Sequence, residues 1–386
     1  MVNNITPTIK YIGVDDLDID LFESQYEVPN GMAYNSYLIE DEKIAIMDTA
    51  DARKGAEWWT NLEEALAGRK PTYLVAHHME PDHASLIAEV VEKFPDIKVV
   101  TSGKAITMLG NFFPEKDLKA NCLEIKNGDT LELGEHALNF VAAPMVHWPE
   151  VMVSYDSKDK VLFSADGFGK FGTLSADEDW ACEARRYYFN ICGKYGMQVQ
   201  KLLKAAATLD IQIICPLHGP ILKENLDYYI GLYDTWSKYG VETEGVLVAY
   251  ASIHGGTKVV AEKVAEMFRE KNIGKVAITD LCRDDMAEAI EDAFRMNRLV
   301  LAAASYDASV FPPMYDFIHH LEMKAYQKRK VALVENGSWA PTAGRVMKQY
   351  IEGFKDVELI EPMVTIKSTL KPENIAQLEE LAGKLM

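Results

Sequence analysis

The sequence has few cysteines, and none of them stand at the spacing of a metal or redox motif. The five cysteines are scattered along the chain at Cys122, Cys182, Cys192, Cys215 and Cys282. An odd number of unpaired cysteines is typical of buried, reduced thiols in a reducing compartment. Because no Cys-x-x-Cys motif occurs, a four-cysteine iron or zinc site and a dithiol redox site are excluded for this chain.

Long hydrophobic runs and excess positive charge are also missing. No apolar run approaches the length of a membrane span, and residues 1–10 lack a basic segment followed by an apolar one. We therefore expect a cytoplasmic protein without membrane contact. The 40 Lys and Arg residues against 59 Asp and Glu residues give a net charge of −19. A nucleic-acid partner, and with it a nuclease function, is excluded because a phosphate backbone requires a basic face.

The chain is long enough for two domains, since it has 386 residues of which 48% are hydrophobic. The first part, residues 1–243, reads as many short strands separated by Gly, Asp, Asn and Pro. "YNSYLIE" and "KIAIMDT" flank Asp41–Glu42, which predicts a β-hairpin. Helical patterns occur at residues 56–67, 84–93, 178–209 and 223–238. These features predict a sandwich of two sheets with helices outside, an α/β layered fold.

The second part, residues 244–386, has a different rhythm. The apolar strands "VLVAY", "KVAITD", "LVLAAAS" and "KVALVEN", and a weaker "VELIEP", alternate with helical segments. We predict these helices at residues 257–271, 286–296, 314–326, 343–353 and 372–384. Strict alternation of strand and helix predicts a parallel sheet covered on both faces. Five strands in this length predict a flavodoxin-like, doubly wound domain.

Metal-ligand side chains are concentrated in "LVAHHMEPDHAS", directly after an apolar run. We expect a strand followed by a loop that carries four of these side chains, His78, Glu80, Asp82 and His83, and a helix that starts at Ala84. Three further candidates follow later strands. The seven nitrogen and oxygen ligands predicted are His78, Glu80, Asp82, His83, His147, Asp166 and His218. A single histidine of this kind is usually structural, but four crowded ionisable groups are costly to bury without a cation.

This set predicts a two-metal site in which one carboxylate bridges. The order His-x-Glu-x-Asp-His, then a lone His, Asp and His, resembles the metallo-β-lactamase fold, an αββα sandwich. Glu80 stands where most zinc hydrolases of that fold have a histidine, and this shifts the preference toward iron. The chain thereby resembles the flavodiiron proteins, also called A-type flavoproteins. The resemblance implies one iron on His78, Glu80 and His147, a second on Asp82, His83 and His218, and a bridging Asp166.

The second half provides a separate indication, because "VAYASIHGGTKVVAEKV" follows a strand and opens a helix. Glycine amides, hydroxyl groups and the helix N-terminus can together hold a phosphate. The spacing resembles the flavodoxin phosphate loop. We predict FMN binding there and in the loops after the third and fourth strands, at Ser252, Ile253, His254, Gly255, Gly256, Thr257, Ser305, Tyr306, Asp307, Ala308, Asn336, Gly337, Ser338, Trp339 and Ala340. Tyr306 or Trp339 could cover the flavin ring, with core packing the alternative for Trp339.

The resemblance implies reduction of dioxygen to water, of nitric oxide to nitrous oxide, or of both, in the cytoplasm of an anaerobe. It implies electrons that pass through FMN to the irons from an external donor such as rubredoxin. It also implies a head-to-tail homodimer or a dimer of dimers. Tyr195 is predicted as a catalytic hydrogen-bond donor near the diiron pocket, with packing at a helix end the alternative.

Two other functions remain open on the sequence. One is a zinc hydrolase of the lactamase fold with an accessory flavodoxin-like domain. The other is a flavin electron carrier without gas chemistry, in which the first half is only a scaffold. Glu80 and the phosphate loop oppose the first, and the seven placed ligands oppose the second.

Overall fold

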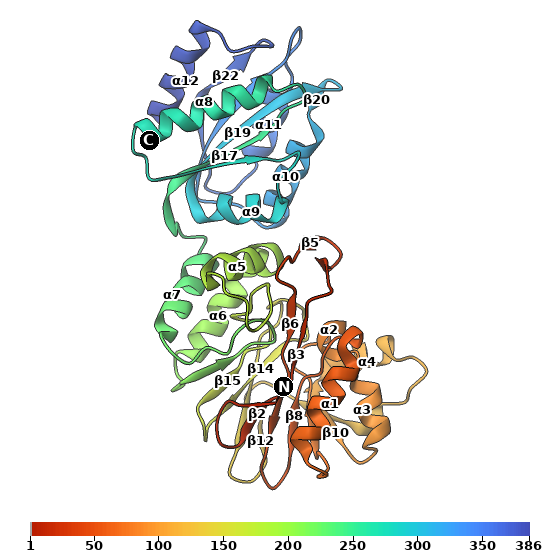
Figure 1. Cartoon of the computed structure of the whole chain (residues 1–386). Helices are drawn as coiled ribbons and strands as arrows, with labels where there is room; N and C mark the ends of the chain where they lie inside the picture. Colours follow the sequence, from red (N-terminus) through yellow and green to blue (C-terminus); the bar gives the residue numbers. More distant parts are fainter. Residues whose placement is uncertain (1) are drawn as a thin grey trace. The chain divides into compact units, whose positions relative to one another are not determined.

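The computed structural model describes residues 2–386 and has two compact units (Figure 1). The first unit ends at Asp234 and the second begins at Thr235. The boundary between residues 243 and 244 stays a prediction from the sequence. Within residues 2–386, every helix is too short or too polar to cross a bilayer.

The N-terminal unit contains two sheets that face each other. The first has the order β1-β2-β7-β8-β9-β10-β11, with β1 Asn3–Asn4, β2 Ile9–Tyr11, β7 Tyr37–Ile39, β8 Ala45–Met47, β9 Tyr73–Val75, β10 Lys98–Ser102 and β11 Cys122–Ile125. The second has the order of β12 Thr130–Glu132, β13 Ala137–Ala142, β14 Met152–Asp156, β15 Val161–Phe163 and β16 Ile213–Cys215. Strands β7 and β8 pair antiparallel around Asp41–Glu42, which confirms the predicted hairpin.

The hydrophobic core of this unit lies between the two sheets. Tyr37 and Val100 from the first sheet share one buried cluster with Phe140, Met152 and Phe163 from the second. The outer faces are covered by α1 Gly55–Leu66, α3 Ile87–Lys93 and α4 Gly103–Phe112 on one side, and by α6 Gly196–Ala206 and α7 Leu226–Ser237 on the other (Figure 1). The predicted sandwich with outer helices is therefore confirmed.

Several elements differ from the prediction. The expected strand "YNSYLIE" is interrupted, because β6 (Met32–Tyr34) pairs with β3 (Val14–Asp16) whereas β7 joins the first sheet. Buried Asn35 lies at this break, and its side chain donates to the carbonyl oxygens of Pro216 and Gly219. Helix α4 and the short strands β4 (Leu21–Phe22) and β5 (Tyr26–Glu27) were not predicted.

The single helix predicted over residues 178–209 was also wrong. The chain forms α5 (Trp180–Tyr187), a π-helical turn at Tyr188–Cys192, a 3₁₀ turn at Gly193–Tyr195 and then α6. Glycine is among the weakest helix formers, and Gly193 and Gly196 lie at the beginning of the last two pieces. The amphipathic pattern of the sequence continues through this break, so the sequence gives no sign that the helix is interrupted.

The C-terminal unit is the predicted flavodoxin-like sheet. Its parallel strands have the order of β18 Lys275–Asp280, β17 Thr243–Ala251, β19 Met296–Tyr306, β21 Lys330–Asn336 and β22 Glu358–Ile366. A short strand, β20 (Ser309–Val310), pairs antiparallel with the end of β19. The sheet lies among α8 Gly256–Glu270, α9 Met286–Arg295, α10 Pro312–Met323, α11 Ala343–Ile351 and α12 Pro372–Leu385 (Figure 1). Since the chain runs outward from β17 in both directions, the switch point lies between β17 and β19.

Candidate metal centre and flavin site

The segment that carries four of the predicted ligands follows β9. Glu80 is the N-cap of the short helix α2 (Pro81–Ala84), and Pro81 occupies its first position. Asp82 and His83 therefore lie in a helical turn, and the loop predicted as far as His83 was wrong. Proline favours a helix start at its own position because its fixed φ suits the first turn and it has no amide hydrogen to leave unpaired.

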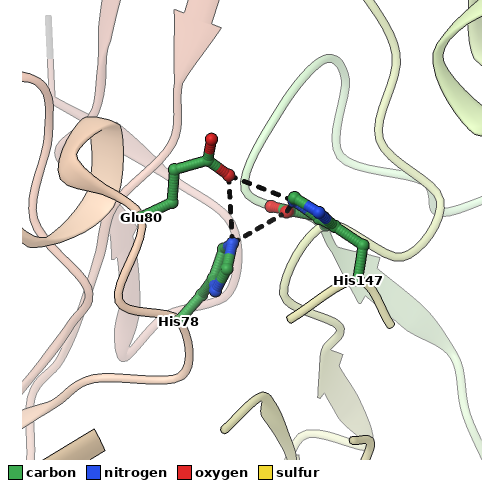
Figure 2. A group of neighbouring side chains, drawn as sticks. His78, Glu80 and His147 are labelled. Carbon is green, nitrogen blue, oxygen red and sulfur yellow. Dashed lines mark hydrogen bonds and ion pairs between the residues drawn. The ribbon is translucent and has the colours of Figure 1, made fainter. Parts of the chain in front are cut away.

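The first group of side chains consists of His78, Glu80 and His147 (Figure 2). The Oε2 atom of Glu80 lies 3.1 Å from Nε2 of His78 and 3.1 Å from Nε2 of His147. His78 follows β9 and His147 precedes β14, so the loops of two different sheets bring these atoms together.

The second group consists of Asp82, His83 and His218. The Nε2 atoms of His83 and His218 are 3.0 Å apart. The Oδ2 atom of Asp82 lies 3.3 Å from each of these two nitrogens. Helix α2 supplies Asp82 and His83, and the loop after β16 supplies His218.

Asp166, three residues after the end of β15, lies between the two groups. Its Oδ2 atom is 3.3 Å from Nε2 of His78 and 3.0 Å from Nε2 of His147. Its Oδ1 atom is 3.4 Å from Nε2 of His83 and 3.9 Å from Nε2 of His218. Each carboxylate oxygen therefore faces one histidine pair. All seven predicted ligand side chains converge on one place.

Two of the three carboxylates in this cluster, Asp82 and Asp166, are buried without a hydrogen bond. Asp82 is 6% exposed and Asp166 is 5% exposed, and neither oxygen of either side chain makes a hydrogen bond. A buried carboxylate oxygen without a partner is costly unless a cation or a proton compensates it. The donor set, histidine nitrogens and carboxylate oxygens, suits a transition-metal ion such as iron.

The pKa values show how strongly the metal-free cluster holds protons. Burial opposes the charged form of His78, but attraction by Asp166 and the contacts with Glu150 and Glu80 prevail and raise its pKa well above the usual value. Burial likewise opposes protonation of His147, yet its contacts with Asp166 and Glu80 raise the pKa to about 9. For Asp82, burial raises the pKa to about 7. Without a metal, protons on these side chains balance negative charge that a bound cation would balance instead.

A second layer of contacts orients the histidine rings, and the sequence interpretation missed it. The Oε1 atom of Glu150 lies 2.8 Å from Nδ1 of His78, and the carbonyl oxygen of Ala33 lies 2.7 Å from Nδ1 of His218. A ring nitrogen that donates in this way leaves Nε2 as the ligand atom. In the sequence, the only indication that Glu150 belongs to the site is its position three residues after His147. His77 lies outside the cluster. Its Nδ1 atom is 2.6 Å from Oδ2 of Asp48, and its Nε2 atom is 2.8 Å from Oγ of Ser154.

A very small cavity adjoins the cluster. It has a volume of about 10 Å³, and its lining includes His147, Asp166, Tyr187, Tyr188 and Ile191. A cavity of this size holds about one water-sized molecule. Tyr195 is half-buried in its 3₁₀ turn and is not among the lining residues, so its predicted role stays a prediction.

The C-terminal unit contains a larger cavity, about 740 Å³, at the carboxyl ends of its strands. Of the residues predicted to bind flavin, all but Gly255 line it. Ala304, Thr342, Ser368 and Thr369 also line it and were missed. Ser368 and Thr369 lie in the loop after the fifth strand, which has no glycine signature. Trp339 is 90% exposed, so the alternative that it packs in the core was wrong.

The first loop of this cavity has the conformation that an anion site needs. Gly255 has a φ of +86° and is the N-cap of α8, whose amide groups receive no side-chain cap. Its own amide donates to Oγ of Ser252 at 3.1 Å. At Gly256 a Cβ atom would stand 2.6 Å from the carbonyl oxygen of Ser368, so only glycine lets these segments approach. Uncapped amides at a helix N-terminus favour a phosphate.

Comparisons with known proteins agree with this geometry. Residues 32–219 match the family described as ODP family beta lactamase. The anaerobic nitric oxide reductase flavorubredoxin of Aliivibrio salmonicida is 26% identical over 353 residues, which are 88% of this chain and 70% of that protein.

Two solved structures have the same fold along the whole chain. Rubredoxin oxygen:oxidoreductase from Desulfovibrio gigas has a TM-score of 0.92 at 24% identity and covers 100% of this chain and 98% of its own. The flavodiiron protein from Giardia intestinalis has a TM-score of 0.93 at 23% identity, and the match covers 100% of this chain and 96% of that protein. Together, these matches show that the chain has the two-unit fold of the flavodiiron proteins and is similar in sequence to a flavorubredoxin.

Proposed function

We propose that this oxidoreductase reduces dioxygen, nitric oxide or both at a non-haem diiron centre, with electrons that reach it through FMN. The observation that carries the proposal is the position of Asp166, whose two oxygens face different histidine pairs. A carboxylate in that position can bridge two ions. The names of the similar flavorubredoxin and oxygen oxidoreductase support the two gases as substrates.

In this proposal, His78, Glu80 and His147 hold one iron, and Asp82, His83 and His218 hold the other. When bound, two ferrous ions and a reduced flavin together supply the four electrons that convert dioxygen into two waters, or the two that couple two nitric oxide molecules. The chain's own contribution is to fix the ligands. Glu150 keeps the His78 ring oriented, and the carbonyl of Ala33 does the same for His218.

The small cavity beside His147 and Asp166 supports a diatomic substrate. Its volume of about 10 Å³ admits a gas molecule, whereas the organic substrate of a hydrolase needs much more room. Its lining residues Tyr187 and Tyr188 are 2% and 1% exposed, so bulk water is kept away from the reacting atoms. This geometry favours gas reduction over the zinc hydrolase alternative.

The 740 Å³ cavity of the second unit fits FMN in size and in chemistry. We propose that the α8 N-terminus and Thr257 hold its phosphate, and that Tyr306 and Trp339, both strongly exposed, cover the ring. The electron donor is an external protein such as rubredoxin, in keeping with the names of the similar proteins. A head-to-tail homodimer, or a dimer of two such dimers, would bring the flavin of one subunit near the irons of the other.

Gas consumption by the reconstituted protein tests the proposal. Protein from iron-supplied cells is reduced anaerobically, and oxygen or nitric oxide uptake is recorded separately with gas electrodes. We expect about two irons and one FMN per chain and consumption of at least one gas. His147→Ala should abolish consumption and lower the iron content, because one ligand of the first group is lost.

The matched control is His319→Ala, a change at an exposed histidine on α10, which should leave both values unchanged. Zinc alone in colourless protein would favour the hydrolase. Yellow protein in which His147→Ala consumes gas as well as the natural chain would favour the electron carrier.

A further inference from the structure

A second cluster of metal-ligand side chains lies outside the candidate diiron centre. His136, Asp156 and Asp159 each offer one ligand atom, and these atoms lie within 4.8 Å of one another. Asp156 ends β14, whereas His147 and Glu150 precede its first residue, so this cluster belongs to the opposite end of that strand. His136 directly precedes β13, and Asp159 lies in the turn between β14 and β15.

Hydrogen bonds already hold one side of each residue in place. The amide of Asp159 donates to Oδ2 of Asp156 at 2.9 Å. Thr8 Oγ1 lies 2.9 Å from Nε2 of His136. The hydroxyl groups of Thr6 and Thr8 donate to Oδ2 of Asp159 at 2.5 and 3.3 Å. These contacts orient the three side chains and join the N-terminal segment to the second sheet.

The remaining atoms, Nδ1 of His136 and Oδ1 of Asp156, are buried and face each other. His136 and Asp156 are both 0% exposed, and neither Nδ1 of His136 nor Oδ1 of Asp156 makes a hydrogen bond. The two atoms are 3.0 Å apart. That separation suits neighbouring ligands of one ion, since two bonds of about 2.1 Å at a right angle place their donor atoms about 3 Å apart.

The charge around His136 favours a cation. Besides Asp156 and Asp159, the carboxylate of Asp41 accepts the backbone amide of His136 at 2.6 Å. Two carboxylates therefore lie near the imidazole of His136, and a third contacts its backbone amide. With its Nε2 hydrogen directed at Thr8, the ring would present Nδ1 as a lone pair toward Asp156.

We propose that His136, Asp156 and Asp159 form a third, structural site for a divalent cation of the Zn²⁺ or Mn²⁺ class. One imidazole and two carboxylates are ligands that both ions accept. Asp159 is only half-buried, which leaves room for water to complete the coordination. The bound ion would fasten the segment around Thr6 and Thr8 to the β13–β15 end of the second sheet.

Metal counting on the full-length protein tests this site. The natural chain, Asp156→Asn and Asp159→Asn are dialysed against Zn²⁺ or Mn²⁺, and total metal per chain is measured by mass spectrometry. Asp117→Asn, at an exposed aspartate, is the matched control. We expect each cluster variant to bind one equivalent less than the natural chain and the control. Because the result is a difference, it holds whichever ions occupy the diiron centre, or if none do.

Thermal unfolding gives a second measurement. Addition of Zn²⁺ or Mn²⁺ should raise the Tm of a chain that carries Asp166→Ala, and the rise should be about 5 °C smaller when Asp159→Asn is added. Equal metal content in the natural chain and in folded Asp159→Asn would overturn the proposal. The cluster would then be a buried ion pair between His136 and Asp156.

Discussion

The Nε2 atoms of His83 and His218 lie 3.0 Å apart in a buried site. Two neutral ring nitrogens at this distance share at most one proton, and the Oδ2 atom of Asp82 faces both. For His218, burial lowers the pKa despite the nearby Asp166, so this ring favours the neutral form that binds metals. This pair therefore offers a site for an ion between the rings.

His218→Ala should remove the second ion selectively. We expect the iron content to fall from about two to about one per chain, because the first group keeps all of its ligands. Iron analysis with gas-uptake measurements checks this. His320→Ala, on the half-buried side of α10, is the control and should keep both irons. Unchanged iron content in His218→Ala would contradict the ligand assignment.

Glu150→Gln should weaken metal binding without removing a ligand. The change replaces the carboxylate that lies 2.8 Å from Nδ1 of His78, and loss of such an outer contact typically lowers metal affinity about 10- to 100-fold. Competition with a chelator measures the affinity. Glu132→Gln, at an exposed position on β12, provides the comparison. If both variants bind metal equally well, Glu150 does not orient the ligand.

Metal affinity should rise with pH. His147, with a pKa of about 9, and Asp82, with a pKa of about 7, must lose protons before they bind a cation. Above about pH 9 both are deprotonated, and His78, whose pKa is also raised, must lose its proton as well. Between pH 9 and 7 each unit of acidification should weaken binding up to about tenfold through His147, and below pH 7 Asp82 steepens the loss. Titration calorimetry in several buffers measures the affinity and the protons released. A pH-independent affinity would show that the cluster is not the binding site.

Thr257→Val should weaken FMN binding through the phosphate alone. Loss of one hydrogen bond to a charged group corresponds to about a tenfold to hundredfold lower affinity. Riboflavin, which lacks the phosphate, should bind equally well to both proteins, because Thr257 lies at the α8 N-terminus. Flavin fluorescence quenching measures both ligands. A similar loss for riboflavin would indicate a damaged cavity.

The two tyrosines near the π-helical turn can be compared directly. Tyr187 lines the small cavity, and its ring centroid is 5.6 Å from that of His218. Burial raises the pKa of its phenol well above the usual value, so it remains a donor. We expect Tyr187→Phe to slow gas reduction about tenfold or more, and Tyr195→Phe to have the smaller effect. The opposite order would support the role predicted for Tyr195.

Much of the fold followed from patterns between neighbours in the sequence. The hairpin around Asp41–Glu42 and the alternation of strands and helices after Gly245 depend on periods of a few residues, which the chain displays directly. The break between Tyr187 and Gly196 was missed because its residues continue an amphipathic pattern. The helix expected from Ala84 begins earlier, at Pro81, because proline suits the first position of a helix.

The sequence by itself determined which chemistry the chain can hold, since ligand types, their spacing after strands and the glycine loop are local properties. Only the tertiary structure decided which atoms meet. It places Glu150 in contact with His78 and Ser368 next to Gly256. It also places Thr8 and Asp156 in contact with His136. These contacts join residues far apart in the chain, and they depend on sheet order and register, which no local pattern encodes.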